Sequence, residues 1–317
     1  MDKARVAVLI SGRGSNMAAL VYAAKQPGCT YEIVLVAAND PEAAGLEFAA
    51  AEGIATFAQS HKGMKRAEFD AVIDAELRKA KADYVALAGY MRLLSPSFVD
   101  GWAGRIINIH PSLLPKYKGL DTHERAIEAG DSHSGCSVHV VTAELDDGPV
   151  LAQTEVAILP GDTADSLAAR VLIAEHQTYS RALAAYVTRE SEPEWLLEQV
   201  RIRAMALPSV EERTSHGSPG FAITGGKFFA TFSQHHHGDE KIALLVKTSG
   251  AEEQAMLVEQ DDNLYFLPPY YAPSGWIGIR LDLGRNDWDH ISAWLQKSWD
   301  ICAPAKLRKA RSVADDF

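Results

Sequence analysis

The chain has 317 residues, of which 47% are hydrophobic and 23% charged, and its formal net charge at pH 7 is −11. This length suits two globular domains, and the composition is that of a folded protein rather than a disordered one. The acidic balance argues against nucleic acid as a partner, because such binding depends largely on Lys and Arg that neutralise phosphates.

Strand and helix signals alternate along the first two-thirds of the chain. The continuous apolar run at 5–10 is typical of a strand buried on both faces. Further strands are expected at 32–38, 83–88 and 105–109, and helices at 16–25, 43–52 and 66–81. This rhythm predicts an α/β fold, with an open, mostly parallel sheet and helices on both faces. Ligands of such sheets collect at the carboxyl ends of the strands.

The pattern changes after His123. Strands are expected at 136–141 and 150–156, followed by a long amphipathic helix at 163–187. The charged stretch Arg189-Glu190-Ser191-Glu192-Pro193 predicts a boundary between a catalytic domain, 1–190, and a second domain, 195–317. Helices are expected at 194–206, 251–260 and 287–302. Strands are expected within 220–233, interrupted by a turn at Thr224-Gly225-Gly226, and at 241–248 and 276–283, which makes the second domain a smaller α+β unit.

The three cysteines and the N-terminus indicate a reduced, cytoplasmic protein. Cys29, Cys136 and Cys302 are far apart and form no CxxC pair, which argues against a disulfide framework and against a metal site. The N-terminal apolar run is short and lacks a cleavage motif. No stretch approaches the roughly 18 apolar residues that span a bilayer, so we expect no membrane partner.

A glycine-rich turn, Gly12-Arg13-Gly14-Ser15-Asn16, separates the first strand from the first helix. Glycines let the backbone approach a ligand closely, and the free N–H groups of a first helical turn bind phosphate well. The spacing lacks the third glycine of a dinucleotide fingerprint and the Lys of a P-loop. A plain strand-to-helix turn is the alternative.

Asn108 and His110 lie at the end of the strand predicted at 105–109. Alternate residues of a strand point the same way, so both side chains face one site. An amide that donates hydrogen bonds and an imidazole that transfers protons suit acyl transfer. The alternative is a capped strand end with a core histidine. Sequence does not decide whether the bond Leu114-Pro115 is cis.

The acidic segment Thr142-Ala143-Glu144-Leu145-Asp146-Asp147-Gly148-Pro149 is either a solvated loop or the source of a carboxylate that faces the histidine. A carboxylate beside an imidazole stabilises its charged form, which suits a general acid.

Together these segments resemble the formyltransferase family that uses 10-formyltetrahydrofolate, and within it glycinamide ribonucleotide formyltransferase. The resemblance covers roughly residues 4–188. It rests on the segments ISGRGSN (10–16), AGYMRLLSPSFV (88–99), GRIINIHPSLLPKYKGLDTH (104–123), GCSVHVVTAELDDGPVLAQ (135–153) and AARVLIAEH (168–176). It implies formyl transfer from 10-formyltetrahydrofolate to the amine of glycinamide ribonucleotide in purine synthesis, without a metal. A homodimer is left open.

The resemblance also implies the role of each site residue. Asn108, His110 and Asp146 match the catalytic positions, with His139 as a supporting histidine. Gly14, Ser15 and Asn16 should hold the substrate phosphate, and Glu175 should contact the glycinamide end. The folate site should be lined by Arg66, Met91, Arg92, Leu93, Leu94, Asn108, Thr142, Ala143, Glu144, Leu145 and Asp146. The chain departs from the family at Tyr90, usually Phe, and at Leu172 or Ala174, where a more polar residue is common.

Other interpretations remain. Methionyl-tRNA formyltransferase shares the central motif but would need a basic C-terminal domain, whereas residues 195–317 contain 13 Lys and Arg against 16 Asp and Glu. Formyltetrahydrofolate deformylase carries an extra N-terminal domain, whereas here the catalytic fold is expected to begin within five residues of Met1. A binding protein without activity is disfavoured by the intact catalytic trio.

Residues 203–304 resemble the MmcQ/YjbR-like family. The similarity is carried by ALPSVEERTSHGSPGFAITGGKFFATFS (206–233) and YYAPSGWIGIRLDL (270–283). Binding of DNA is disfavoured by the near balance of charges. The run His235-His236-His237 is expected to be an exposed hairpin loop, with metal binding as the alternative. A regulatory or docking module is the preferred interpretation of this domain.

Overall fold

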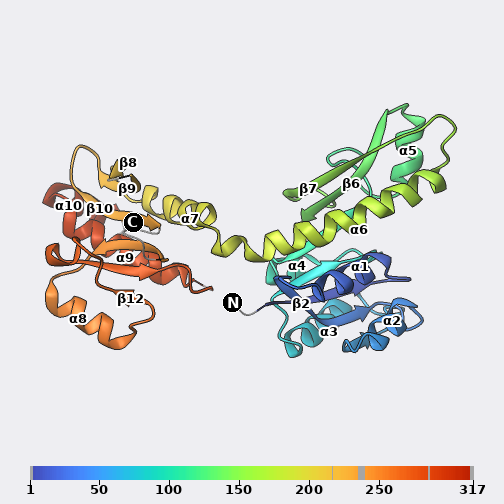
Figure 1. Cartoon of the computed structure of the whole chain (residues 1–317), viewed down its shortest axis with the longest axis horizontal. Coiled ribbons are helices and arrows are strands. Elements are labelled where there is room, and N and C mark those ends of the chain that lie inside the picture. The colour runs from blue at the N-terminus through green and yellow to red at the C-terminus, as the bar shows by residue number, and fades with distance from the viewer. Residues whose placement is uncertain (1–2, 216, 235–239, 285, 315–317) are drawn as a thin grey trace. The chain divides into compact units, whose positions relative to one another are not determined.

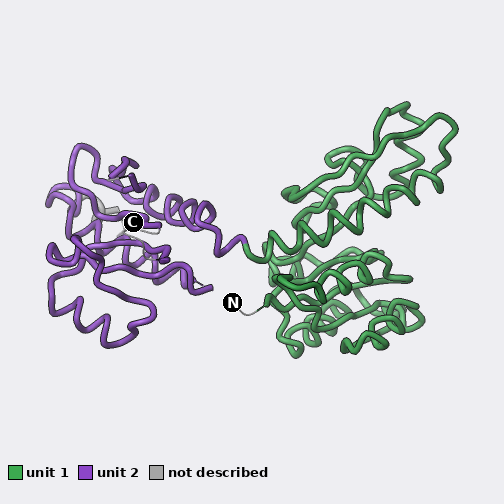
Figure 2. The backbone as a smooth tube through the Cα atoms, viewed as in Figure 1, with its two compact units in different colours: residues 1–188 green, residues 189–317 purple. Residues whose placement is uncertain are grey.

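The structure is a computed structural model that describes residues 3–215, 217–234, 240–284 and 286–314. The chain divides into two compact units, Met1–Thr188 (unit 1) and Arg189–Phe317 (unit 2), as Figure 2 shows. Each unit has its own sheet, of seven strands in unit 1 and six in unit 2. The histidine run 235–237 lies outside the described residues.

Strands and helices alternate along unit 1 (Figure 1). Its elements are β1 (Ala4–Ile10), α1 (Ser15–Ala24), β2 (Tyr31–Ala38), α2 (Gly45–Ala51), β3 (Thr56–Ala58), α3 (Arg66–Lys79), β4 (Tyr84–Leu87), α4 (Pro96–Gly101), β5 (Ile106–His110), α5 (Thr122–Glu128), β6 (His133–Val140), β7 (Val150–Ala157) and α6 (Ala164–Thr188).

The strand order in unit 1 is β3-β2-β1-β4-β5-β6-β7. The first five strands of the chain, β1 to β5, are parallel to one another, whereas β6 pairs antiparallel with both β5 and β7. The predicted open, mostly parallel α/β sheet is therefore confirmed. From β1 the chain adds β2 and β3 on one side of the sheet and then β4 and β5 on the other. Ligands of such sheets bind at the carboxyl ends of the strands where this switch occurs, here between β1 and β4.

The buried strand β1 shows why this sheet needs helices on both faces. Val6, Val8 and Ile10 pack into a core with side chains of α1 and α6. Ala7 and Leu9 point the other way, into a core with side chains of α3 and α4. Alternation along a strand thus explains the continuous apolar run in the sequence.

Helix α6 is fixed to the sheet by a buried tyrosine. Tyr179 is fully buried, and its hydroxyl donates to the carbonyl oxygens of Leu87 (3.0 Å) and Ile107 (2.9 Å). These carbonyls belong to β4 and β5. One side chain therefore aligns α6, one turn beyond Glu175, with the two strands that lead into the candidate site.

Unit 2 is an antiparallel sheet with helices. Its elements are η1 (Arg189–Ser191), α7 (Pro193–Met205), β8 (Val210–Ser215), β9 (Ser218–Ile223), β10 (Phe228–Gln234), β11 (Ile242–Lys247), α8 (Ala251–Gln260), β12 (Tyr265–Phe266), η3 (Ala272–Ser274), β13 (Trp276–Arg280), α9 (Trp288–Cys302) and α10 (Ala305–Ala314). The strand order is β12-β13-β11-β10-β9-β8. Helices α7 and α9 cover one face, where Leu244, Ile277 and Trp299 are buried. This antiparallel sheet confirms the expected α+β class.

Several short elements carry no clear sequence signal. Strand β3 has three residues and β12 has two, which is too short for a period to be visible. Helix α4, which was not expected, begins at the pair Ser95-Pro96, where the Ser95 hydroxyl accepts from the Phe98 N–H. By contrast, the strands expected within 220–233 and the turn expected at 224–226 are confirmed as β9, β10 and their connection.

Candidate active site

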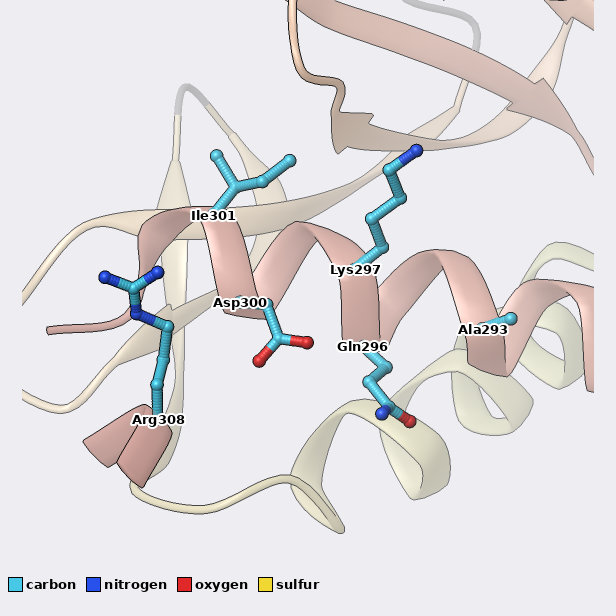
Figure 3. Close-up of a pocket in the computed structure, with 6 residues that line it drawn as sticks. All are labelled: Ala293, Gln296, Lys297, Asp300, Ile301 and Arg308. Carbon is cyan, nitrogen blue, oxygen red and sulfur yellow. The ribbon is translucent and has the colours of Figure 1, made fainter. Parts of the chain in front are cut away.

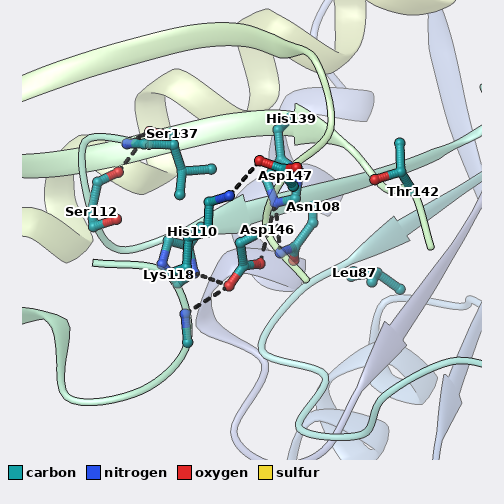
Figure 4. A network of polar contacts seen from close by, with 12 residues as sticks. Leu87, Asn108, His110, Ser112, Lys118, Ser137, His139, Thr142, Asp146 and Asp147 are labelled. Carbon is teal, nitrogen blue, oxygen red and sulfur yellow. Dashed lines mark hydrogen bonds and ion pairs between the residues drawn. The ribbon is translucent and has the colours of Figure 1, made fainter. Parts of the chain in front are cut away.

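Asn108, His110 and His139 meet because of the pairing between β5 and β6. Asn108 and His110 are alternate residues of β5, and His139 lies directly opposite Asn108 in the antiparallel register. Opposed residues of such a pair lie within side-chain contact. Figure 4 shows the three side chains gathered around Asp146, which comes from the loop between β6 and β7.

His110 is buried and its ring has an acceptor at each nitrogen. Nε2 lies 2.9 Å from the carbonyl oxygen of Tyr117. Because a carbonyl can only accept, Nε2 carries a hydrogen. Nδ1 lies 3.4 Å from Oδ2 of Asp146, with both side chains less than a tenth exposed. The Tyr117 carbonyl therefore orients the ring so that Nδ1 faces the carboxylate of Asp146.

The groups around Asp146 favour its ionised form. Burial tends to raise its pKa, but contact with the His139 imidazole, the hydrogen bond from the Gly119 N–H and the charge of His110 leave the pKa below its usual value. The Gly119 N–H donates to Oδ2 at 2.9 Å, and His139 Nε2 lies 3.6 Å from Oδ1. The carboxylate thus stands between two imidazoles.

The orientation of Asn108 depends on His139. Nδ1 of His139 lies 3.0 Å from the Val140 carbonyl oxygen and so carries a hydrogen. Its Nε2 lies 3.1 Å from Nδ2 of Asn108 and accepts from that amide. An amide nitrogen has two hydrogens, so the second N–H of Asn108 stays available to a ligand.

The turn after His110 is supported from β6 and β7. Ser137, opposite His110 in the register, donates to the Ser112 carbonyl and accepts from the Leu114 N–H. Gln153 donates to the Leu114 carbonyl at 2.8 Å. The following bond, Leu114-Pro115, is cis.

The glycine-rich turn after β1 borders a cavity of about 340 Å³. The cavity is lined by Ser11, Gly12, Arg13, Gly14, Ser15, Asn16, Ala88, Gly89 and Met91. Gly14 precedes α1 with a φ of 68°, a left-handed conformation that glycine adopts without strain. The first-turn N–H groups of α1 have no acceptor within the helix, and Ser15 and Asn16 of this turn line the cavity.

Asn16 and Glu175 form a buried polar pair at the same end of unit 1. Nδ2 of Asn16 donates to Oε2 of Glu175 at 2.7 Å. Oδ1 of Asn16 is buried without a partner among the described residues. Burial raises the pKa of Glu175, partly offset by the Asn16 hydrogen bond. An amine or amide ligand could donate a hydrogen bond to the unpartnered Oδ1 of Asn16.

The segment Met91–Leu94 borders the glycine-rich cavity through Met91. Met91 is 75% exposed, and its N–H donates to Ser11 Oγ at 2.8 Å. The guanidinium of Arg92 lies over the ring of Phe69 on α3, 4.8 Å from its centroid. Asp70 is buried and accepts from the Ser95 N–H at 2.6 Å. Helix α3 thus supports this exposed segment from below.

The remaining predicted folate residues lie at two places in unit 1. Arg66 is the exposed first residue of α3. The loop after β6 contains the exposed residues Ala143, Glu144 and Leu145, and Thr142 Oγ1 donates to the Glu144 carbonyl at 3.4 Å. The loop returns at Gly148, where a Cβ would lie 1.8 Å from the Val140 carbonyl oxygen, so only glycine fits.

Tyr117 and Gly119 contribute to the site although no role was expected for either residue. Both act through backbone groups, the carbonyl toward His110 and the N–H toward Asp146. Any residue carries these groups, so residue type gave no signal for them. Arg13 was part of the quoted glycine turn but was assigned no role, although it lines the cavity.

Unit 2 has a shallow hollow of about 470 Å³ between α9 and α10. Figure 3 shows its lining side chains, Ala293, Gln296, Lys297, Asp300, Ile301 and Arg308. Charges of both signs are mixed with apolar groups there. Among the described residues we found no group of three His, Cys, Asp or Glu side chains arranged to hold a metal ion, and no helix long and apolar enough to cross a membrane.

Comparison with known proteins identifies the class of both units. Residues 4–183 match the formyl transferase family, and residues 205–301 match the YjbR family. The first match covers more than half of the chain. The chain belongs to the formyl transferase family, with a YjbR domain following it.

Relatives of unit 1 include proteins named as formyltransferases and a protein named for purine biosynthesis. The phosphoribosylglycinamide formyltransferase of Escherichia coli is 46% identical over 175 residues, which are 55% of this chain and 82% of the relative. A crystal structure of the enzyme of that name from Brucella melitensis is 50% identical, with a TM-score of 0.56, and covers 58% of this chain and 96% of the other. The trifunctional purine biosynthetic protein adenosine-3 of Drosophila melanogaster is 47% identical over 186 residues. The match covers 58% of this chain but only 14% of that relative.

Proposed function

We propose that unit 1 transfers the formyl group of 10-formyltetrahydrofolate to the amine of glycinamide ribonucleotide, a step of purine biosynthesis. The observation that carries this proposal is the cluster of Asn108, His110 and Asp146 at the carboxyl end of β5. It lies in the same sheet as the glycine-rich cavity at the carboxyl end of β1. The names of the relatives support the same activity.

The glycine-rich cavity is the proposed site of the ribonucleotide phosphate. N–H groups of Gly14, Ser15 and Asn16 at the start of α1 would donate to its oxygens, aided by the positive end of the helix dipole. Glu175 would accept from the glycinamide end, using the polar capacity that its pair with Asn16 leaves unfilled. The reacting amine is thereby placed between the cavity and His110.

The folate would lie against the segment Met91–Leu94 and the loop 142–146. Arg66, at the start of α3, would lie near the acidic end of the folate. Binding both substrates side by side turns a reaction between two molecules into an effectively unimolecular step, which supplies much of the rate acceleration. The apolar side chains Met91, Leu93 and Leu145 are more than half exposed and offer contact surface for the flat ring system.

In the chemical step, the amine nitrogen forms a bond to the formyl carbon and a tetrahedral oxyanion develops. The free N–H of Asn108 and the Nδ1 side of His110 would donate to this oxygen, since Nε2 is engaged by Tyr117. Donors placed in advance for a developing oxyanion contribute about 3–4 kcal/mol in comparable sites.

Collapse of the intermediate breaks the bond between the formyl carbon and the folate nitrogen. The amine proton must reach that nitrogen, and we assign the transfer to a water held by Asp146. Its carboxylate is ionised at neutral pH, faces Nδ1 of His110 and would accept a hydrogen bond from the water. His139 fixes the Asn108 amide and contacts the same carboxylate.

The test is a direct assay of the purified chain with both substrates, followed by its His110→Ala and Asp146→Asn variants. Both variants should retain ribonucleotide binding and lose formyl transfer. Transfer to initiator methionyl-tRNA, or release of formate without an acceptor, would favour the tRNA-directed or deformylase activities instead.

For unit 2, our proposal is a regulatory or docking role. Its hydrophobic core is separate from that of unit 1, so it is built as a module in its own right. Deleting residues 195–317 and measuring kinetics and oligomeric state tests the role. Unchanged values for both would contradict it.

A further inference from the structure

An ion pair joins two loops on either side of the candidate site. Lys118 Nζ contacts Asp147 Oδ1, as the close-up in Figure 4 shows. Lys118 belongs to the segment 111–121 that follows β5, and Asp147 belongs to the loop 141–149 between β6 and β7. The pair therefore bridges two segments that leave neighbouring strands of the sheet.

Each partner is adjacent in sequence to a contact of the catalytic pair. Lys118 stands between Tyr117, whose carbonyl holds His110 Nε2, and Gly119, whose N–H holds Asp146 Oδ2. Asp147 directly follows Asp146. If Lys118 and Asp147 moved relative to each other, the neighbouring peptide groups would move with them. Both His110 and Asp146 would then change position.

Loop 111–121 is firmly tied without the ion pair. The Tyr117 hydroxyl donates to Asp131 at 2.8 Å, and Lys116 pairs with the same carboxylate at 3.0 Å. Arg125 donates to the Lys118 carbonyl at 2.8 Å. Of the two loops, this one is the fixed side of the bridge.

Backbone hydrogen bonds hold loop 141–149 at its base, and the contacts of Asp146 hold it farther out. Gly148 is pressed against the Val140 carbonyl, but Leu145 at the tip is 52% exposed. Asp146 has a φ of 49°, a left-handed conformation that the local backbone does not favour and that tertiary contacts must maintain. The contacts that reach the tip from the other loop are those of Lys118 and Gly119.

We propose that the Lys118–Asp147 ion pair is a latch that closes the loop 141–149 onto the loop 111–121 and so positions Asp146 against His110. This inference rests on the proposed function, because the latch acts on the folate side of that site. The side chains are 35% and 55% exposed, so dissolved salt screens the pair and loosens the latch.

The decisive experiment is a charge swap in the full chain, with variants Lys118→Glu, Asp147→Lys and the double variant. Hydrogen exchange of the loop 141–149 is measured without substrates, and kcat and both KM values are measured with them. Each single variant should speed exchange and lower kcat/KM for formyl-folate about fivefold, the upper range for an exposed ion pair. KM for the ribonucleotide should not change. The double variant should recover both quantities to within about twofold, because it restores an attractive pair.

A matched control is the exposed ion pair Lys25–Glu52, which lies in unit 1 between α1 and the end of α2. Lys25→Glu should change neither exchange in the loop 141–149 nor kcat/KM. Raised salt should reduce kcat/KM for formyl-folate in the natural chain and have less effect in Lys118→Met.

The latch is overturned if the single variants exchange and turn over like the natural chain, or if the double variant is no better than the singles. If the natural chain transfers no formyl group, the proposed function is wrong. The hydrogen-exchange measurements would still decide whether the ion pair holds the loop 141–149. If Asp147→Lys fails to fold, Lys118→Met gives the same exchange readout.

Discussion

Oδ2 of Asp146 lies 3.4 Å from Nδ1 of His110, with both groups buried. A charge-assisted hydrogen bond is usually about 2.7–2.9 Å long. The contact is therefore close enough to stabilise a charged imidazole, yet Nδ1 is not fully committed to the carboxylate. It remains able to donate to an oxyanion that develops beside it.

Replacing the carboxylate should abolish most of the activity. Asp146→Asn keeps the shape but removes the charge that stabilises imidazolium, and we expect kcat to fall at least about 100-fold, as for loss of an oxyanion donor. Binding of glycinamide ribonucleotide, measured by calorimetry, should stay within twofold. An Asp146→Asn enzyme with full kcat would refute the assigned role.

His139 should matter through Asn108. His139→Leu removes the acceptor for the Asn108 amide and frees it to rotate, so kcat should fall about tenfold, the equivalent of one hydrogen bond. KM for the ribonucleotide is measured alongside and should not change. His139→Gln, which offers an acceptor oxygen, should recover part of the loss. Equal losses in both variants would mean that the imidazole itself is required.

Asp146 should also contribute to stability at neutral pH, and this contribution should be lost in acid. Its folded pKa is lower than its ordinary value of 3.8, so the stabilisation is present above that value and is lost as the pH falls through the folded pKa. The difference in unfolding free energy between the natural chain and Asp146→Asn should therefore narrow below about pH 4. Urea titrations at pH 6, 4 and 3 test this. A difference that widens in acid would contradict the direction of the shift.

The sequence indicates some of these relationships and not others. Strand periodicity places Asn108 and His110 on one face, because the period of two is a property of any extended chain. The approach of Asp146 depends on a left-handed backbone and on the Gly119 N–H, and neither has a signature in residue type. The fold followed from the alternation of buried strands and helices, whereas β3 and β12 were too short to show a period.

Arg13 should strengthen binding of the substrate phosphate. Its side chain lines the glycine-rich cavity, where a positive charge would meet the phosphate dianion. Arg13→Ala should raise KM for glycinamide ribonucleotide about tenfold, the effect of one charged hydrogen bond, with kcat little changed. Arg13→Lys retains the charge and should lose less. An unchanged KM in Arg13→Ala would show that the helix N-terminus alone holds the phosphate.

Tyr179 should be important for stability rather than for chemistry. Tyr179→Phe leaves the Leu87 and Ile107 carbonyls without their donor in a fully buried place, which should lower the free energy of unfolding by about 1–3 kcal/mol. Urea denaturation measures the loss. Tyr186→Phe is the matched control, because that hydroxyl donates to the Gly104 carbonyl from a partly exposed position. The two variants should differ by more than 0.5 kcal/mol, roughly the spread of surface substitutions, and equal losses would contradict this account of α6.

The central claim is the formyl transfer itself. The purified full chain is incubated with 10-formyltetrahydrofolate and, in parallel, with glycinamide ribonucleotide, with initiator methionyl-tRNA or with no acceptor. We expect formylated ribonucleotide and tetrahydrofolate in equal amounts in the first mixture. We expect no turnover with methionyl-tRNA or without an acceptor. Formylated methionyl-tRNA, or formate released without an acceptor while the ribonucleotide stays unmodified, would contradict it.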